Sequence, residues 1–449
     1  MFKESLLDKI LYRIKKLIPK RVFNFFAPMY HTGLAWAGAM LYGYPSKSLK
    51  VIGVTGTKGK STTVFLISKI FVGAGIPVAA IGSLGFLIAG EAGASSDEGA
   101  SRARSEGGER SRSPLRVQEW PNHLKMTMPG RFKLQKFFYK AKKAGCEYVI
   151  LEVTSEGIKQ KRHLGIDFDC AVFTNIHKEH LESHGSFENY YHAKQELFKR
   201  TSNIHVLNAD DQNVELFSKF SSKRTIFYGL EAGDMRPKNL QIHPDHSSFE
   251  LYGIKFDIKF GGRFNVSNCL AALATGAMYG LDLPKAKPAL EAVTNLPGRM
   301  EFIQKHPFGV VVDYAHTPDS LEAVYKNLKT DSGKLICVLG AAGGGRDKWK
   351  RPEFGRIADQ YCDEIILTDE DPYDEDPEKI IEEVRSGIHS KNKVIKVLDR
   401  KEAIKTAIGK AKEGDMVVIT GKGSEVSVAV AGGRKIPWSD REIVREFLK

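Results

Sequence analysis

A glycine-rich run with one lysine beside several hydroxyl side chains is the part of this sequence best suited to chemistry. It reads Gly53-Val-Thr-Gly56-Thr57-Lys58-Gly59-Lys60-Ser61-Thr62-Thr63. Glycines let the backbone approach an anion closely, and the first N–H groups of a following helix point at it. Lys60 adds a positive charge, and Ser61 offers a hydroxyl ligand for Mg²⁺. We therefore expect nucleotide phosphates here, although Val54 replaces the first glycine of a strict Walker A motif.

A carboxylate stands where such a phosphate loop needs a metal ligand. Glu152 directly follows the apolar run 148–151, which has the pattern of a buried strand. The carboxyl ends of parallel strands meet at one edge of a sheet, beside the phosphate loop. Because Mg²⁺ prefers oxygen ligands, Glu152 is a candidate ligand.

Histidines gather after the next strand pattern, where His177, His180 and His184 lie within eight residues. A zinc site would be one explanation, but neither a cysteine nor a regular helical histidine pair accompanies them. Exposed surface histidine is the ordinary interpretation of His177 and His184. Lys194 lies in a helical pattern, where a lysine by itself indicates only a solvent-facing position.

Strand and helix patterns alternate around these residues. In the first series, strands are expected at 49–54, 78–81, 148–151 and 170–173, and helices at 62–76, 133–144 and 187–200. In the second series, strands are expected at 310–312, 335–339, 364–367, 394–397 and 416–419. A helix should start at Thr317-Pro318, with threonine as N-cap and proline at the first helical position. The alternation predicts an α/β protein with mostly parallel sheets wrapped by helices.

Three parts are expected along the chain. Residues 1–48 form a short, helical, apolar and basic N-terminal segment, residues 49–298 a central P-loop ATPase domain, and residues 299–449 a Rossmann-like domain. Residues 89–118 are rich in Gly, Ser, Arg and Glu, and we expect them to form a disordered surface insert.

The length, composition and net charge of the chain indicate which class of protein it belongs to. The 449 residues suffice for two to three domains, and 42% hydrophobic with 27% charged residues is typical of a soluble globular protein. A net charge of +13 suits an anionic partner. Basic residues are not interleaved with aromatics, so we expect no nucleic acid, and an acidic phosphorylated substrate fits the charge.

The five cysteines are scattered, and no two form a CxxC pair. This spacing favours neither structural zinc nor a disulfide framework. We expect free, mostly buried thiols in a reducing cytosol.

Residues 22–46 lack any charged side chain and follow a basic stretch. Their length would permit a membrane span, but Asn24, Pro28, His31 and several glycines weaken the hydropathy. The far flank is also basic, which disfavours a single span. We expect a helix packed on the protein, with peripheral membrane contact as the alternative. The protein is then cytoplasmic, and in the alternative case it lies at the inner face of the membrane.

Many of these motifs, in this order, resemble the Mur ligase family, from about residue 50 to the C-terminus. The family consists of ATP-dependent enzymes that add amino acids to a nucleotide-linked muramyl peptide, and the branch adding the third residue is the most similar. The matching segments are 56–62, 152–155, 174–185, 262–268, 296–301, 313–318, 343–348 and 421–425.

The resemblance implies roles for particular residues. ATP would be bound by Gly56, Thr57, Lys58, Gly59, Lys60, Ser61, Thr62, Asn265, Asn268, Arg299, Asp313 and His316. Two Mg²⁺ ions would be held, the first by Ser61 and Glu152 and the second by His180 and a carbamylated Lys194. Lys60, His180 and Lys194 would be catalytic. The substrates would be bound by Thr127, Thr154, Ser155, Gln160, Arg162, Arg346, Asp371, Tyr373, Gly421 and Glu425. Among these, Arg346 would hold the carboxylate of the incoming amino acid, and Glu425 would hold an amine.

Departures from the family pattern concern the substrates. The large N-terminal domain that binds UDP is replaced by about 48 residues, and Ser155-Glu156-Gly157 replaces Ser-His-Ala. Glu370-Asp371-Pro372-Tyr373 stands where Asp-Asn-Pro-Arg is associated with diaminopimelate. Tyr373 cannot clamp a carboxylate as arginine does, which favours lysine or another amine.

The implied reaction is phosphorylation of a peptide carboxylate by ATP, followed by attack of an amine on the acyl phosphate, in a monomeric enzyme. Two alternatives stay open on the sequence: a folylpolyglutamate synthetase-like ligase, and a membrane-associated P-loop binding protein without ligase activity. The histidine and lysine of the expected second metal site favour a ligase over the binding protein.

Overall fold

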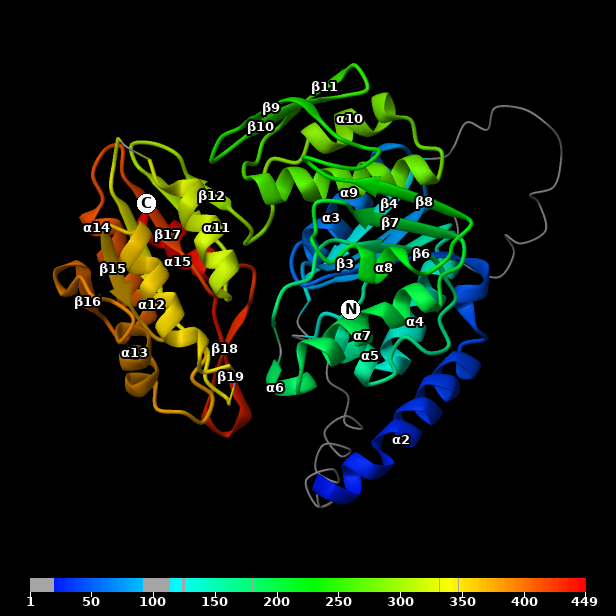
Figure 1. Ribbon diagram of the computed structural model, residues 1–449, viewed down its shortest axis with the longest axis horizontal. Helices are drawn as coiled ribbons and strands as arrows, with labels where there is room; N and C mark the ends of the chain where they lie inside the picture. Colours follow the sequence, from blue (N-terminus) through cyan, green and yellow to red (C-terminus); the bar gives the residue numbers. More distant parts are fainter. Residues whose placement is uncertain (1–19, 92–113, 123–125, 180, 331, 346) are drawn as a thin grey trace.

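The computed structural model describes residues 20–91, 114–122, 126–179, 181–330, 332–345 and 347–449. Two α/β parts lie side by side, each built on its own sheet (Figure 1). The prediction of an α/β fold with mostly parallel sheets is confirmed.

The central sheet has eight strands among the described residues, in the order β4-β3-β2-β5-β1-β6-β7-β8. The run from β2 to β8 is parallel, while β3 and β4 extend it as antiparallel edge strands. The strands are β1 (Lys50–Thr55), β2 (Val78–Gly82), β3 (Gly85–Glu91), β4 (Leu115–Trp120), β5 (Tyr148–Glu152), β6 (Phe168–Phe173), β7 (Ile204–Asn208) and β8 (Arg224–Tyr228).

Helices cover both faces of this sheet because its inner strands are apolar throughout. One face packs on α3 (Lys60–Gly73), α9 (Arg263–Met278) and α10 (Leu283–Glu291). The other packs on α4 (Arg131–Lys143), α5 (Ser155–Lys159), α7 (Phe187–Lys199) and α8 (Glu215–Ser218), with α6 (Leu181–His184) beside α7. The expected strands and helices of the first series are confirmed, with ends shifted by up to three residues.

A small antiparallel sheet, which the sequence analysis did not predict, lies over α10 and joins the same core (Figure 1). Its strands are β9 (Lys238–Ile242), β10 (Ser247–Leu251) and β11 (Ile254–Ile258). Each strand has five residues, and none of the three is buried throughout, so each gives a weak signal on its own.

The C-terminal sheet has the order β12-β13-β17-β14-β15-β16, parallel except for β12 at its edge. Helices α11, α12 and α13 cover one face, and α14 and α15 the other. All five strands expected in this part are confirmed, as is the helix start at Pro318, where Thr317 forms a capping box.

The C-terminal strands are β12 (Glu301–Gln304), β13 (Gly309–Val312), β14 (Leu335–Leu339), β15 (Glu364–Leu367), β16 (Val394–Lys396) and β17 (Met416–Ile419), with β18 (Ser427–Val430) and β19 (Arg434–Pro437) forming a separate hairpin. The helices are α11 (Pro318–Leu328), α12 (Lys350–Tyr361), α13 (Pro377–Arg385), α14 (Arg400–Lys410) and α15 (Asp440–Phe447).

The prediction of a disordered insert over 89–118 is wrong at both ends. Residues 89–91 belong to β3 and residues 115–118 to β4, and the two strands pair from Glu91 with Leu115 onward. Strands β3 and β4 pair across the polar segment that separates them in sequence. The composition of that segment gives no sign of this pairing. Residues 92–113 lie outside the described part of the chain.

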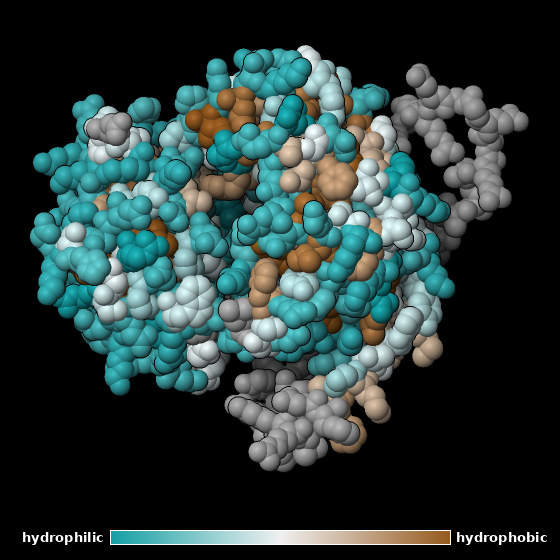
Figure 2. Space-filling view, viewed as in Figure 1, coloured by the Kyte–Doolittle hydropathy of each residue, from teal (hydrophilic) through white to brown (hydrophobic). Residues whose placement is uncertain are grey.

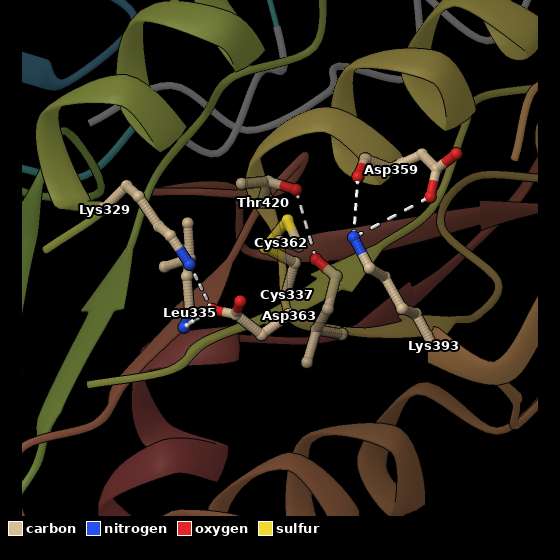
Figure 3. The surroundings of a disulfide bond; sticks show 9 residues. Lys329, Leu335, Cys337, Asp359, Cys362, Asp363, Lys393 and Thr420 are labelled. Atoms are coloured by element: carbon tan, nitrogen blue, oxygen red, sulfur yellow. Dashed lines mark hydrogen bonds and ion pairs between the residues drawn. A yellow bond between two sulfur atoms is a disulfide. The ribbon is translucent and has the colours of Figure 1, made fainter. Parts of the chain in front are cut away.

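The prediction that all cysteines are free is wrong for one pair. Cys337 in β14 and Cys362 before β15 form a disulfide, with Cα atoms 6.2 Å apart (Figure 3). Parallel pairing of β14 with β15 brings the two together, which spacing along the chain does not reveal. Cys146, Cys170 and Cys269 are free and buried, as expected.

Residues 22–46 include most of α2 (Lys20–Leu41) and the first two residues of the short 3₁₀ helix that follows (Pro45–Ser48). The helix lies along the outside of the central part, packed on α4 (Figure 1). Among the described residues, no helix combines the length and apolar character needed to cross a membrane.

Candidate active site

The glycine loop lies between the end of β1 and the start of α3. Gly56 and Gly59 have φ angles of 150° and 80°, and Gly59 is the N-cap of α3. A Cβ on Gly59 would lie 2.3 Å from Oδ1 of Asn268 in α9. Glycine is therefore required at this position by both the backbone conformation and the close approach of a second helix.

Residues following β6 hold the loop in place. The backbone N–H of Lys58 donates to Oδ1 of Asn175 at 2.8 Å, and that of Thr57 donates to the Asn175 carbonyl at 2.8 Å. Oγ1 of Thr174 donates to the Lys58 carbonyl at 2.6 Å. The Thr-Asn pair singled out in the sequence thus orders the loop from outside.

Lys60 folds back over the loop, with Nζ donating to the Thr57 carbonyl at 2.9 Å. A nucleotide phosphate bound at the N-terminus of α3 would lie in the same loop. The ammonium group is therefore already within the loop that a phosphate would enter.

Ser61 and Glu152 present two oxygens to one point. Oγ of Ser61 donates to Oε1 of Glu152 at 3.0 Å, and the backbone N–H of Ser83 donates to Oε2 at 2.8 Å. A buried carboxylate with a hydroxyl suits Mg²⁺ coordination. Within the described residues, no group of three or more His, Cys, Asp and Glu side chains could hold a metal. His180, the expected ligand of the second ion, lies outside them.

Lys194 lies beneath the loop rather than in the open cleft. Its side chain is buried, and Nζ donates to the Gly56 carbonyl at 2.6 Å. Burial, followed by the nearby charge of Lys60, holds the pKa of Lys194 well below its usual value. A lysine of α7 that sequence pattern would leave in solvent is thus an interior amine beside the phosphate loop.

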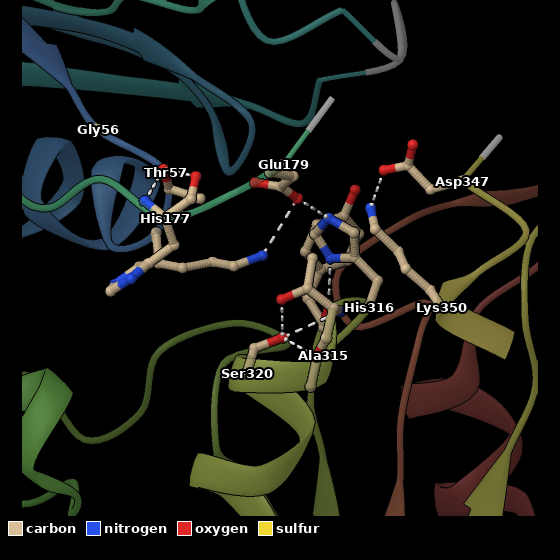
Figure 4. Close-up of polar contacts among 12 residues, drawn as sticks. Gly56, Thr57, His177, Glu179, Ala315, His316, Ser320, Asp347 and Lys350 are labelled. Atoms are coloured by element: carbon tan, nitrogen blue, oxygen red, sulfur yellow. Dashed lines mark hydrogen bonds and ion pairs between the residues drawn. The ribbon is translucent and has the colours of Figure 1, made fainter. Parts of the chain in front are cut away.

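Glu179 links the two parts of the molecule across the cleft. Its Oε1 lies 3.2 Å from Nζ of Lys58 in the loop and 3.5 Å from Nε2 of His316 in the C-terminal part (Figure 4). Burial lowers the pKa of Lys58 to about 8, although Glu179 opposes this shift. Glu179 was not predicted as a site residue from the sequence. Its position directly before the expected metal ligand His180 could have indicated it.

The C-terminal wall of the cleft is ordered around Asp313. This carboxylate accepts hydrogen bonds from the backbone N–H of Met300 at 2.6 Å and of Ala315 at 2.7 Å, while burial raises its pKa. The guanidinium of Arg299 lies 4.2 Å from the centre of the Tyr314 ring. These contacts fix the turn that carries His316 toward Glu179.

A second polar group lies deeper in the C-terminal part. Nζ of the fully buried Lys422 contacts Asp371 at 2.9 Å and Glu425 at 2.5 Å. Glu370 is buried beside them, and desolvation raises the pKa of this carboxyl to about 7. Sequence analysis named Asp371 and Glu425 but missed Lys422, which the pattern Gly-Lys-Gly-Ser-Glu contained.

The expected acceptor residues are held by short polar contacts on the central part. Oγ of Ser83 lies 2.8 Å from Oγ1 of Thr127, and a guanidinium nitrogen of Arg162 donates to Oε1 of Gln160 at 2.7 Å. Thr154 instead caps α5, with its Oγ1 accepting from the Gly157 N–H at 3.0 Å.

One cavity of about 1130 Å³ runs between the two parts and opens to the surface (Figure 2). The predicted site residues that line it are Thr57, Lys58, Gly59, Lys60, Ser61, Thr62, Thr127, Glu152, Thr154, Ser155, Arg162, Asn265, Asn268, Arg299, Asp313, His316, Asp371, Gly421 and Glu425. Gly56, Gln160, Lys194 and Tyr373 are not among the lining residues. Arg346, like His180, lies outside the described residues.

Comparison with known proteins identifies relatives over most of the chain. The Mur ligase middle domain matches residues 54–276, and the Mur ligase, glutamate ligase domain matches residues 298–423. UDP-N-acetylmuramoyl-L-alanyl-D-glutamate--2,6-diaminopimelate ligase 1 of Clostridium acetobutylicum is 35% identical over 444 residues, which cover 96% of this chain and 85% of that protein. The corresponding ligase of Aquifex aeolicus is 37% identical over 413 residues, 91% of this chain and 79% of that protein.

A solved structure of a UDP-N-acetylmuramoyl-L-alanyl-D-glutamate--2,6-diaminopimelate ligase superimposes with a TM-score of 0.58 at 30% identity, covering 89% of this chain and 78% of the other. The matched residues include the glycine loop on one wall of the cavity and Asp371 and Gly421 on the other. On these grounds the chain belongs to the Mur ligase family, whose members are ATP-dependent ligases that form amide bonds.

Proposed function

We propose that this enzyme joins the amine of an amino acid to the carboxylate of a UDP-linked muramyl peptide, with ATP as the energy source. The observation that carries the proposal is that one cavity has the glycine loop on one wall and Asp371 and Glu425 on the other. A phosphoryl donor and an amine could meet there, as ligation of a carboxylate requires.

ATP would lie along the loop with its phosphates at the N-terminus of α3. Lys60 would contact the migrating phosphoryl group, whose charge it offsets. Asn265 and Asn268 would lie on the adenine side, and Arg299 would reach the phosphates from the C-terminal part. Closure of the two parts, through Asp313 and His316, would exclude water from the reaction.

Ser61 and Glu152 are the residues that would hold the first Mg²⁺, and their convergent oxygens fit such an ion. The second would be held by His180 and by Lys194 after carbamylation, in which the amine nitrogen bonds to carbon dioxide and loses a proton. The depressed pKa of Lys194 supports this, because only the neutral amine reacts. When bound, the ions offset the repulsion between a carboxylate and the γ-phosphate.

In the reaction, an acceptor carboxylate oxygen attacks the γ-phosphorus and ADP leaves, giving an acyl phosphate. The amine then attacks the acyl carbon, the C–N bond forms, and inorganic phosphate departs. Thr127, Ser155, Gln160 and Arg162 would orient the acceptor. The amine would be directed by Glu425, whose contact with Lys422 fixes its position.

The incoming amino acid is proposed to be lysine or another amine without a distal carboxylate. Tyr373 has a left-handed φ of 53°, and a Cβ on Gly344 would meet its ring at 2.9 Å. A neutral ring in this place offers no bidentate partner for a carboxylate. Arg346 would hold the α-carboxylate, with Asp371 and Gly421 completing the pocket.

We further propose that the enzyme is a cytoplasmic monomer whose residues 22–46 make peripheral contact with the inner face of the membrane. The exposed apolar side chains of this segment, such as Met29 and Met40 of α2, support the surface contact.

The test is phosphate release by purified protein with ATP, Mg²⁺ and UDP-muramoyl-dipeptide, with lysine, diaminopimelate and other amines added singly. Release that needs both the acceptor and one amine is the expected result, and Lys60→Ala should abolish it. In parallel, Tyr373→Arg should shift the preference toward diaminopimelate. Wild-type preference for diaminopimelate would contradict the proposed amine, while no release with any pair would contradict the proposed acceptor.

A further inference from the structure

Helix α2 exposes an apolar face to solvent, which reverses the usual arrangement of a surface helix. Phe26, Met29, Tyr30, Trp36 and Met40 lie on that face, with exposed fractions of 53%, 75%, 43%, 48% and 68%. They follow the spacing of one side of an α-helix. An exposed apolar face of this extent indicates a binding surface.

The opposite side of α2 is made of small residues and is fixed to the protein. Ala35 and Ala39 are fully buried, and a Cβ on Gly38 would lie 3.6 Å from the backbone of Arg131, where α4 begins. Rotating α2 to bury its large side chains would break this close packing. The helix therefore holds them outward.

Helix α4, against which α2 packs, adds positive charge. Its sequence from Arg131 to Lys143 contains six basic residues and no acidic one. Lys136, Lys140, Lys142 and Lys143 are exposed, and so is Tyr139, whose ring centre lies 6.0 Å from that of Tyr42 at the end of α2. The Tyr42–Tyr139 contact joins the end of α2 to this lysine-rich helix.

We propose that this α2–α4 face docks on a bilayer surface rich in anionic lipid. The face comprises Phe26, Met29, Tyr30, Trp36 and Met40 of α2 with Lys136, Tyr139, Lys140, Lys142 and Lys143 of α4. Apolar and aromatic side chains enter the headgroup boundary, and the lysines contact lipid phosphates. The inference deepens the proposed membrane contact of residues 22–46 and does not depend on the ligase reaction.

Charge favours a bilayer over a second copy of the chain. In a twofold interface formed by this face, the lysines would find no acidic partner on the second copy, because neither α2 nor α4 contains an acidic residue. Anionic headgroups complement the lysines instead. In addition, α2 lies along the outer edge of the central part and not between the two parts (Figure 1), so docking leaves the cleft free to close.

The experiment measures co-sedimentation of the full chain with vesicles of phosphatidylcholine alone or mixed with phosphatidylglycerol. We expect binding to the anionic vesicles, weakened by salt, and a blue shift of tryptophan fluorescence that Trp36→Phe removes. Lys136→Glu with Lys140→Glu should weaken binding about tenfold or more. Met29→Ser with Met40→Ser should abolish binding to the vesicles while leaving amine-dependent phosphate release unchanged.

A matched control places the same charge change elsewhere. Lys259→Glu with Lys285→Glu alters exposed lysines beside β11 and on α10, at the far end of the central part from α2 (Figure 1), and should leave vesicle binding unchanged.

Absence of binding by the wild-type chain would overturn the proposal, as would equal binding to neutral vesicles. It would also be overturned by a concentration-dependent dimer that Met29→Ser with Met40→Ser dissociates, because a second copy would then occupy the face. Phosphate release is measured separately, so failure of docking is distinct from failure of the ligase assignment.

Discussion

Individual ionisable side chains carry the strongest departures from ordinary behaviour in this molecule. Lys194 is an interior amine under the phosphate loop, and Glu370 is an interior carboxyl beside Lys422. Burial of a charge costs free energy of folding unless a partner compensates for it. Such positions are expected where function, rather than stability, sets the residue type.

Replacing Lys194 should separate its effect on stability from its effect on activity. Because burial depresses its pKa, the unfolded state binds the proton more tightly, and at neutral pH this lowers the free energy of unfolding. Lys194→Met should therefore increase that free energy, as measured by urea denaturation at pH 7. It should lower amine-dependent phosphate release about 100-fold or more.

The surface change Lys199→Met in the same helix is the control and should affect neither quantity. Bicarbonate should raise the activity of wild type, and a carbamate on Lys194 should be detectable by mass spectrometry of the intact protein. A fully active Lys194→Met variant would exclude the proposed role.

The raised pKa of Glu370 should make the free energy of unfolding depend on pH. Its pKa is raised from 4.5 to about 7, so the folded state holds a proton that the unfolded state has released. Its stabilising contribution is complete below about pH 4.5 and is lost as pH rises toward and through 7. Glu370→Gln should match wild type near pH 4 and exceed it by about 3 kcal/mol at pH 8. Chemical denaturation across this range is the measurement, with the exposed Glu446→Gln as control. Parallel pH curves for wild type and Glu370→Gln would contradict the assignment.

At the scale of elements, the phosphate site depends on how closely three segments meet. The loop after β1 is bonded to Thr174 and Asn175 after β6, and Gly59 touches Asn268 of α9. The carboxyl ends of adjacent parallel strands provide this meeting point. The nucleotide site is therefore a property of the packed sheet and not of the loop alone.

Two glycines with similar φ angles separate the effect of backbone strain from the effect of a close contact. Gly59 and Gly75 have φ angles of 80° and 70°, but a Cβ at Gly75 has no neighbour within 4 Å. Gly75→Ala should cost about 1 kcal/mol of stability and leave ATP binding intact. Gly59→Ala should cost more and prevent ATP binding, as measured by calorimetry. Normal ATP affinity in Gly59→Ala would refute the required contact with Asn268.

At the scale of the whole molecule, the active cavity exists only when the two α/β parts face each other. Glu179 makes this connection, because its carboxylate lies between Lys58 of the loop and His316 of the C-terminal part. Closure of this kind gates many ligand-bound enzymes on slow timescales. The Glu179 carboxylate therefore couples the loop to the position of the second part.

Glu179→Gln should loosen that coupling. Removing the charge beside Lys58 costs about 1–3 kcal/mol of interaction, so the free protein should sample wider openings. X-ray scattering without nucleotide should give a larger radius of gyration, and KM for ATP should rise. The exposed Glu188→Gln on α7 is the control. An unchanged radius together with an unchanged KM would argue against a closing role.

The sequence by itself determined the fold class, the order of most strands and helices, and the glycine loop. These follow from local physics: apolar runs bounded by turns form buried strands, and a glycine-lysine turn before a helix suits phosphate. The match of the motifs along the chain also predicted the family, which the comparisons confirmed.

The tertiary structure decided everything that depends on distant residues meeting. Only the folded chain pairs Cys337 with Cys362 and β3 with β4, buries Lys194, and turns the apolar face of α2 outward. In each case the sequence supplies the side chain, but its partner lies on another element. Burial, charge and pKa are set by those partners, and spacing along a single chain does not encode which of them will be near.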